Sequence, residues 1–273
     1  MSYKMIVLDL DDTLLRDDHT ISERTKEALM KAQEQGVKVV LASGRPTPGM
    51  LHIADELSLA QYGSFILSFN GGKIINYSTK KEMFSSTLSL PQVKKLYELS
   101  QHEGVDLHTY VGHEIIAETD NPYTRIESQL TGLPVKLVED FVEGVEEEVV
   151  KVLMVGDPDK MKTVEAKLQV ELAEEFSVMR SKPFFLEFTE KGVTKGTSLN
   201  QLIQACGIKR EEVIAMGDSY NDQAMIEFAG LGVAMGNAPD DIKEIADHVT
   251  DTNMNDGVAK VVEEFVLRHL VEA

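Results

Sequence analysis

The chain is poor in three features that would each assign it to a particular class of protein: cysteine, long apolar runs and basic charge. Its 273 residues include a single cysteine, Cys206, so an internal disulfide is excluded. No apolar run approaches the roughly 18 residues that a membrane-spanning helix needs, and no secretory signal peptide is recognisable. We therefore expect a soluble, cytoplasmic protein with no membrane partner.

Basic charge is scarce relative to acidic charge. Lys and Arg total 27 against 46 Asp and Glu, which gives a net charge of −19 at pH 7. A field of this sign repels nucleic acid and anionic lipid, so neither is an expected partner. An anionic substrate would have to be attracted by local positive charge. The length allows one large core and a smaller one, and the oligomeric state stays unknown.

What the chain does have is an acidic cluster at the end of its first apolar segment. Residues 5–8 are apolar, and Asp9, Asp11 and Asp12 follow them. Two close carboxylates at the tip of a buried strand repel each other unless a metal or a proton neutralises one of them. Phosphoryl transfer would use this asymmetry, because Asp9 could attack while Asp11 keeps a proton for the leaving oxygen. On its own, such a cluster could also be an ordinary polar turn.

Three further segments have the same pattern of an apolar stretch, a polar tip and the start of a helix. Their polar tips are, in chain order, Ser43 with Gly44, Lys195, and Asp218 with Asn221 and Asp222. Amides and a hydroxyl at a helix start bind phosphate well. Ligands of open α/β sheets bind where the carboxyl ends of the strands meet, so we expect these side chains to converge with Asp9 and Asp11.

These motifs resemble those of the haloacid dehalogenase-like (HAD) phosphatases, in particular the Cof-type members with a large C2 (IIB) cap. The matching segments are D-L-D-D-T-L at 9–14, A-S-G-R at 42–45, the lysine of K-G-V-T-K-G at 191–196, and G-D-S-Y-N-D at 217–222. Their order and spacing match over nearly the whole chain, and the pattern is most similar to the sugar-phosphatase subgroup. Asp12 departs from it, because the family usually has glycine there, and we assign Asp12 no catalytic role.

The resemblance implies a role for each matching residue. Asp9 would be the nucleophile that forms an aspartyl-phosphate, and Asp11 would be the general acid and then the general base. Mg²⁺ would lie between Asp9, the backbone carbonyl of Asp11 and Asp218, an oxygen ligand set that suits this ion. The other implied roles are phosphate binding by Ser43, Gly44, Lys195 and Asn221, orientation of Lys195 or of a metal-bound water by Asp222, and contact with the leaving group by Arg45 and Asn70.

The order of the segments predicts a discontinuous core with an insertion. Strand and helix patterns alternate up to about residue 70 and resume from Lys195. We expect a doubly wound, Rossmann-like parallel-sheet α/β core made of 1–82 and 188–273, with an α+β cap domain at 83–187. Within the cap, helices are expected at 91–103, 122–131 and 159–173, and extended segments at 105–118, 149–155, 176–180 and 184–189.

The expected function is Mg²⁺-dependent hydrolysis of a small phosphorylated metabolite, with sugar phosphates as the first guess, because a large cap excludes macromolecules. A phosphomutase of the same fold stays open, since it would pass the phosphoryl group of the same intermediate back to a sugar. A non-catalytic receiver-type phospho-acceptor uses similar groups, but its acceptor Asp lies on a later strand and it has no insert of this size. A dehalogenase is disfavoured, because it does not need the acid that Asp11 supplies.

Overall fold

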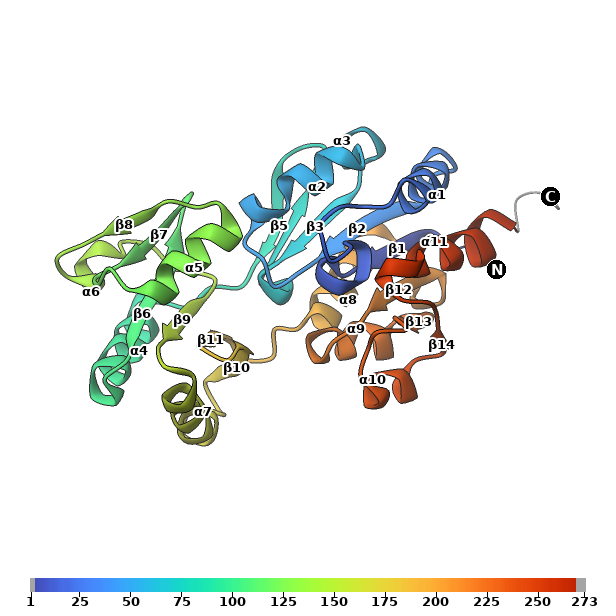
Figure 1. Ribbon diagram of the computed structural model, residues 1–273. Coiled ribbons are helices and arrows are strands. Elements are labelled where there is room, and N and C mark those ends of the chain that lie inside the picture. The colour runs from blue at the N-terminus through green and yellow to red at the C-terminus, as the bar shows by residue number, and fades with distance from the viewer. Residues whose placement is uncertain (1–2, 269–273) are drawn as a thin grey trace. The chain divides into compact units, whose positions relative to one another are not determined.

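The computed structural model describes residues 3–268, which divide into two compact units (Figure 1). The larger unit contains the described residues up to Phe84 and from Thr194 onward, and the smaller unit is Ser85–Val193. The boundaries therefore lie slightly later than the expected 82 and 187. Strand β5 (Lys81–Ser85) runs across the first expected boundary, and β11 (Phe185–Glu190) belongs to the sheet of the smaller unit and continues past the second.

Within residues 3–268, the larger unit is built on one sheet of eight strands in the order β14-β13-β12-β1-β2-β3-β4-β5. Its other strands are β1 (Met5–Leu8), β2 (Lys38–Ala42), β3 (Phe65–Ser68), β4 (Lys73–Asn76), β12 (Val213–Gly217), β13 (Leu231–Ala234) and β14 (His248–Val249). Neighbours from β14 to β3 are parallel, which confirms the expected α/β core, but β4 is antiparallel to β3. The short turn Phe69–Gly71 between them cannot hold the crossover that a parallel neighbour needs.

Helices cover both faces of this sheet. They are α1 (Glu23–Glu34), α2 (Leu51–Glu56), α3 (Leu59–Tyr62), α8 (Lys195–Cys206), α9 (Gln223–Phe228), α10 (Asp240–Ile245) and α11 (Gly257–Val261). Ile6 of the central strand packs in one buried cluster with Leu29 of α1, whereas its neighbour Val7 packs in another with Leu199 of α8. A strand that is buried on both faces has to be apolar throughout, as residues 5–8 are.

The smaller unit is a mixed α+β structure on a second sheet, in the order β10-β11-β9-β6-β7-β8. Its remaining elements are α4 (Leu90–Glu103), β6 (Asp106–Val111), β7 (Glu114–Ala117), α5 (Pro122–Thr131), β8 (Val135–Leu137), α6 (Phe141–Gly144), β9 (Val152–Val155), α7 (Pro158–Glu171) and β10 (Phe176–Lys182). The paired strands are antiparallel except β7 and β8. One core, which includes Leu96, Val152 and Leu168, packs helices against this sheet.

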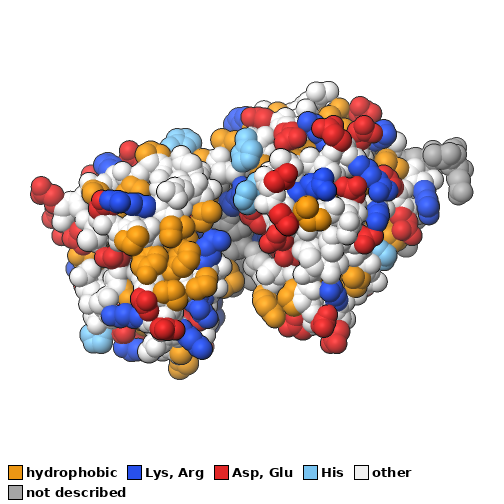
Figure 2. Space-filling view, in the orientation of Figure 1, with side chains coloured by type: hydrophobic (Ala, Val, Ile, Leu, Met, Phe, Trp, Pro, Cys, Tyr) orange, Lys and Arg blue, Asp and Glu red, His pale blue; other side chains and the backbone are white. Residues whose placement is uncertain are grey.

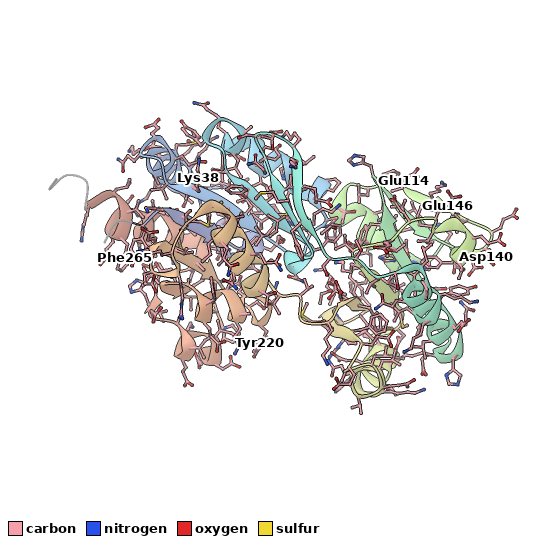
Figure 3. All side chains as sticks on the ribbon, turned by 180° about the vertical axis from the view of Figure 1, so that it is seen from behind. Lys38, Glu114, Asp140, Glu146, Tyr220 and Phe265 are labelled. Carbon is pink, nitrogen blue, oxygen red and sulfur yellow. The ribbon has the colours of Figure 1, made fainter. Side chains whose placement is uncertain are left out.

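Charged side chains of both signs are interspersed on the visible face of each unit (Figure 2). On the smaller unit, Glu146, which is labelled in Figure 3, begins an exposed run of three glutamates, Glu146–Glu148. None of the helices in residues 3–268 combines the length and the apolar character that crossing a bilayer would require.

Candidate active site

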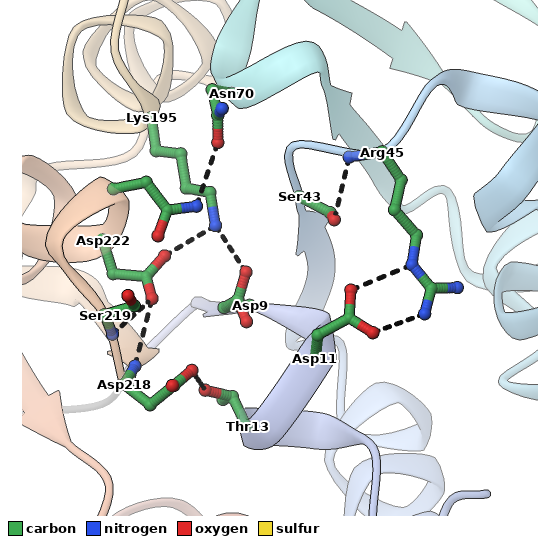
Figure 4. A network of polar contacts seen from close by, with 11 residues as sticks. Asp9, Asp11, Thr13, Ser43, Arg45, Asn70, Lys195, Asp218, Ser219 and Asp222 are labelled. Carbon is green, nitrogen blue, oxygen red and sulfur yellow. Dashed lines mark hydrogen bonds and ion pairs between the residues drawn. The ribbon is translucent and has the colours of Figure 1, made fainter. Parts of the chain in front are cut away.

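The two acidic residues of the opening motif point in different directions, each toward a basic residue (Figure 4). Asp9 directly follows β1 and is buried, with 6% of its surface exposed. Asp11 lies in the tight turn Leu10–Leu14, and 46% of its side chain is exposed. Asp9 faces Lys195, whereas Asp11 faces Arg45.

Lys195, at the start of α8, links Asp9 to Asp222. Its fully buried ammonium group donates hydrogen bonds to Asp9 Oδ1 at 2.5 Å and to Asp222 Oδ1 at 2.6 Å. Burial acts to lower the pKa of Lys195, but the two carboxylates outweigh burial and raise that pKa above its ordinary value. The lysine is therefore charged. Asp222 Oδ2 accepts the backbone N–H groups of Asp218 (3.0 Å) and Ser219 (3.1 Å), so Asp222 fixes both Lys195 and the turn after β12.

Arg45 binds Asp11 through two hydrogen bonds. Its Nε donates to Asp11 Oδ2 at 2.9 Å, and its Nη2 donates to Asp11 Oδ1 at 2.5 Å. The backbone N–H of Arg45 donates to Ser43 Oγ at 3.1 Å, which holds this hydroxyl at the carboxyl end of β2. Arg45, which was expected to face the leaving group, thus contacts the expected general acid in this structure.

Two asparagines, Asn70 and Asn221, contact each other beside Ser43. Asn221 Nδ2 donates to Asn70 Oδ1 at 3.0 Å, and the backbone N–H of Asn70 donates to the carbonyl oxygen of Ser43 at 2.9 Å. A Cβ added to Gly44 would lie 3.2 Å from the Asn70 amide, so glycine allows this close approach. Ser43, Gly44, Asn70 and Asn221 therefore adjoin one another at the strand ends.

Three carboxylates converge beside Lys195. One oxygen from each of Asp9, Asp218 and Asp222 lies within 4.8 Å of the other two. Burial, followed by repulsion from Asp222, raises the pKa of Asp9 well above its usual range, and the same two causes raise the pKa of Asp218 to about 7. A bound cation would offset the burial and mutual repulsion of these carboxylates. Hard carboxylate oxygens suit Mg²⁺, so the residues fit that ion. The side chain of Asp11 is not part of this trio.

Thr13 is a contact in the site that the sequence analysis missed. It is buried, and its Oγ1 donates to Asp218 Oδ1 at 2.9 Å, which links the opening motif to the loop after β12. Thr13 lies within the D-L-D-D-T-L segment, and a hydroxyl in an otherwise apolar stretch after the acidic cluster was the available signal.

Comparisons with known proteins give the family and the fold of the chain. The family model of haloacid dehalogenase-like hydrolases matches residues 6–262. A haloacid dehalogenase-like hydrolase from Bacteroides thetaiotaomicron is 45% identical, with a TM-score of 0.90, over 96% of this chain and 99% of that one. A HAD subclass IIB sugar phosphatase is 28% identical, with a TM-score of 0.80, over 96% and 98% of the two chains.

A curated relative extends the comparison to activity. The 5-amino-6-(5-phospho-D-ribitylamino)uracil phosphatase of Bacillus subtilis (strain 168) is 34% identical over 265 residues, which cover 97% of this chain and 96% of the relative. The chain therefore belongs to the haloacid dehalogenase-like hydrolases and, within that family, to the phosphatases.

Proposed function

We propose that the chain is a Mg²⁺-dependent phosphatase that hydrolyses small phosphomonoesters, sugar phosphates first among them, through an aspartyl-phosphate on Asp9. The observation that carries this proposal is the buried ammonium of Lys195, which holds Asp9 at a strand tip beside two more carboxylates. A carboxylate aligned in this way is suited to nucleophilic attack. The similarity to a HAD subclass IIB sugar phosphatase supports the choice of substrate class.

The reaction would proceed in two steps on the same pair of acids. In the first, Asp9 attacks phosphorus, the bond from phosphorus to the leaving oxygen breaks, and Asp11 donates a proton to that oxygen. In the second, Asp11 takes a proton from water as the water attacks the phosphorus of the aspartyl-phosphate. Inorganic phosphate leaves, and the Asp9 carboxylate is regenerated.

Delivery of a proton by Asp11 requires its pair with Arg45 to separate. Both oxygens of Asp11 accept hydrogen bonds from the guanidinium group in this structure. An incoming phosphate ester would compete for the same guanidinium group, because Arg binds phosphate as well as carboxylate in a bidentate manner. Arg45 would then contact the substrate and Asp11 would become free to reach the leaving oxygen.

The remaining residues would bind the phosphate group and the metal. Ser43, Gly44, Lys195 and Asn221 would contact the phosphate oxygens. Asp9, Asp218 and the backbone carbonyl of Asp11 would hold Mg²⁺, and Asp222 would keep Lys195 in place. When bound, the ion would reduce repulsion between the nucleophile and the phosphate and stabilise charge in the transition state. The smaller unit, Ser85–Val193, would serve as the cap that restricts substrates to small phosphorylated metabolites.

A screen of phosphorylated metabolites with Mg²⁺ tests this proposal through release of inorganic phosphate. In the variants Asp9→Asn and Asp11→Asn, kcat should fall by about a thousandfold or more. Asp240→Asn is the matched control, because it makes the same chemical change at an exposed position of α10 and should keep the wild-type rate. Full activity in Asp9→Asn would refute the role of Asp9 as nucleophile. Hydrolysis of phosphoproteins as fast as of small metabolites would refute the proposed specificity.

A further inference from the structure

The turn that carries Asp11 is held by a residue from a distant loop. Asp12 follows Asp11 in the left-handed conformation, with φ 62° and ψ 7°. Its carbonyl oxygen accepts a hydrogen bond of 2.8 Å from the side-chain amide of Asn237, which lies just beyond β13. L-residues prefer right-handed or extended backbone, so this turn needs stabilising contacts from outside its own sequence.

The amide of Asn237 is fixed in one orientation by a second asparagine. Asn237 Oδ1 accepts the backbone N–H of Asn253 at 3.1 Å, which leaves the Asn237 NH₂ group facing Asp12. The buried side chain of Asn253 donates in turn to the carbonyl oxygen of Leu15 at 3.0 Å and to Asp17 Oδ1 at 3.3 Å. Side-chain amides from two loops therefore hold both ends of the segment 12–15.

We infer that Asn237 is a positioning residue for Asp11, and this inference rests on the acid–base role of Asp11 in the proposed function. The side chain of Asp11 is half-exposed, and its main partner, Arg45, has to release it during the reaction. Once released, the direction of the carboxyl group depends on the backbone of residues 11–12. The hydrogen bond from Asn237 fixes the Asp12–Thr13 peptide, on the far side of the left-handed residue that follows Asp11. Its loss would therefore misdirect proton transfer while leaving the Asp9–Lys195–Asp222 contacts intact.

Proton transfer can be measured separately from phosphoryl transfer by changing the leaving group. The alkoxide of a sugar is a poor leaving group and needs a proton from the general acid, whereas p-nitrophenolate leaves without one. The ratio kcat/KM reports the steps up to release of the leaving group, so it excludes the second step, in which Asp11 would act as general base for both substrates. A variant with a misdirected Asp11 should therefore lose kcat/KM on a sugar phosphate but much less on p-nitrophenyl phosphate. A general loss of structure would reduce both activities together.

The test compares Asn237→Asp with wild type on p-nitrophenyl phosphate and on the sugar phosphate that wild type hydrolyses fastest. Asn237→Asp keeps the acceptor for Asn253 but replaces the donor to Asp12 with a second oxygen. We expect kcat/KM on the sugar phosphate to fall about tenfold, and kcat/KM on p-nitrophenyl phosphate to change by less than about twofold. Asn237→Ala, which removes both hydrogen bonds without adding charge, should show the same selectivity if the aspartate variant folds poorly.

Two controls separate the possible failures. Asn255→Asp makes the same change of charge at an exposed position two residues after Asn253 and should match wild type on both substrates. Asp11→Asn should show the leaving-group selectivity more strongly than either Asn237 variant. Equal effects on kcat/KM for both substrates, or no effect, in the Asn237 variants would overturn the positioning role. An Asp11→Asn variant without selectivity would instead contradict the proposed role of Asp11, and failure of wild type to hydrolyse either ester would contradict the proposed function itself.

Discussion

Asp12 occupies a backbone conformation that a side chain makes costly, with φ at 62°. Glycine has no such cost, and aspartate tolerates this region better than most residues. We expect Asp12→Gly to leave the free energy of unfolding within about 1 kcal/mol of wild type, because relief of strain offsets the greater entropy of the unfolded chain. Asp12→Val should lower it by about 1–2 kcal/mol, because a β-branched residue is a true outlier at this φ. Urea unfolding measures both values.

Asp12→Asn separates charge from conformation, because asparagine shares the tolerance of aspartate for left-handed backbone. Its free energy of unfolding should stay within about 0.5 kcal/mol of wild type, as for most surface substitutions. Equal stabilities of the glycine and valine variants would show that the left-handed turn does not persist in solution.

At single residues, the sequence was informative where chemistry coincides with the end of a strand. Asp9 and Asp218 could be placed together because parallel strands end at one edge of the sheet. Thr13 and Asn237 could not be found in this way. Their roles depend on hydrogen bonds between loops that lie far apart in the sequence, and an isolated Thr or Asn carries no signal of such a partner. The two orientations of Asp9 and Asp11 likewise follow from the local turn and could not be derived from the spacing.

At the level of elements, predictions held where local signals mark both ends. Helix α5 spans Pro122–Thr131, as expected, because Asn121 caps its start and Gly132, with φ +72°, ends it. The extended segment 105–118 is instead two strands, β6 and β7, around a turn at Gly112 with φ +57°. Strands β4 and β5 were not predicted, since short, partly exposed strands have a weak alternating pattern.

Strand β6 carries a histidine that should make the smaller unit sensitive to acid. His108 is fully buried; its Nδ1 lies 3.0 Å from Thr124 Oγ1, and its Nε2 has no hydrogen-bond partner among the described residues. Burial, together with the charge of Lys151, lowers the pKa of His108 to about 3. The unfolded chain, with an ordinary histidine pKa near 6.5, therefore binds a proton that the folded unit does not, and stability falls as the pH drops from about 6.5 toward 3.

The free energy of unfolding should fall by about 2 kcal/mol between pH 7 and pH 5 because of His108. His108→Gln cannot titrate and should lose that much less stability over the same range. Hydrogen exchange of the β6 backbone amides in wild type and variant gives the comparison, and the difference between them removes the effect of all other titrating groups. Parallel pH profiles in the two proteins would show that His108 takes up its proton without unfolding.

For the whole molecule, the net charge of −19 and the acidic trio both lead us to expect that cations stabilise the folded state. Lys195 donates hydrogen bonds to Asp9 and Asp222, whereas burial and repulsion from Asp222 raise the pKa of Asp218 to about 7. Because the folded-state pKa of Asp218 is raised, its ionisation costs stability as the pH rises from about 4 to 7, and the full cost applies above pH 7. Binding of Mg²⁺ by the folded state should offset that cost.

We therefore expect MgCl₂ at pH 8 to raise the Tm. The free energy of unfolding should rise by about 2.7 kcal/mol once the ion is at 100 times its Kd. Asp218→Asn keeps an acceptor for Thr13 but removes the charge. This variant should be more stable than wild type in Mg²⁺-free buffer, by about 1 kcal/mol or more, and should gain little from Mg²⁺. Thermal unfolding with MgCl₂, against NaCl at the same ionic strength, makes the measurement. A rise of equal size in NaCl would mean that screening of the overall negative charge, rather than an ion held by Asp9 and Asp218, stabilises the fold.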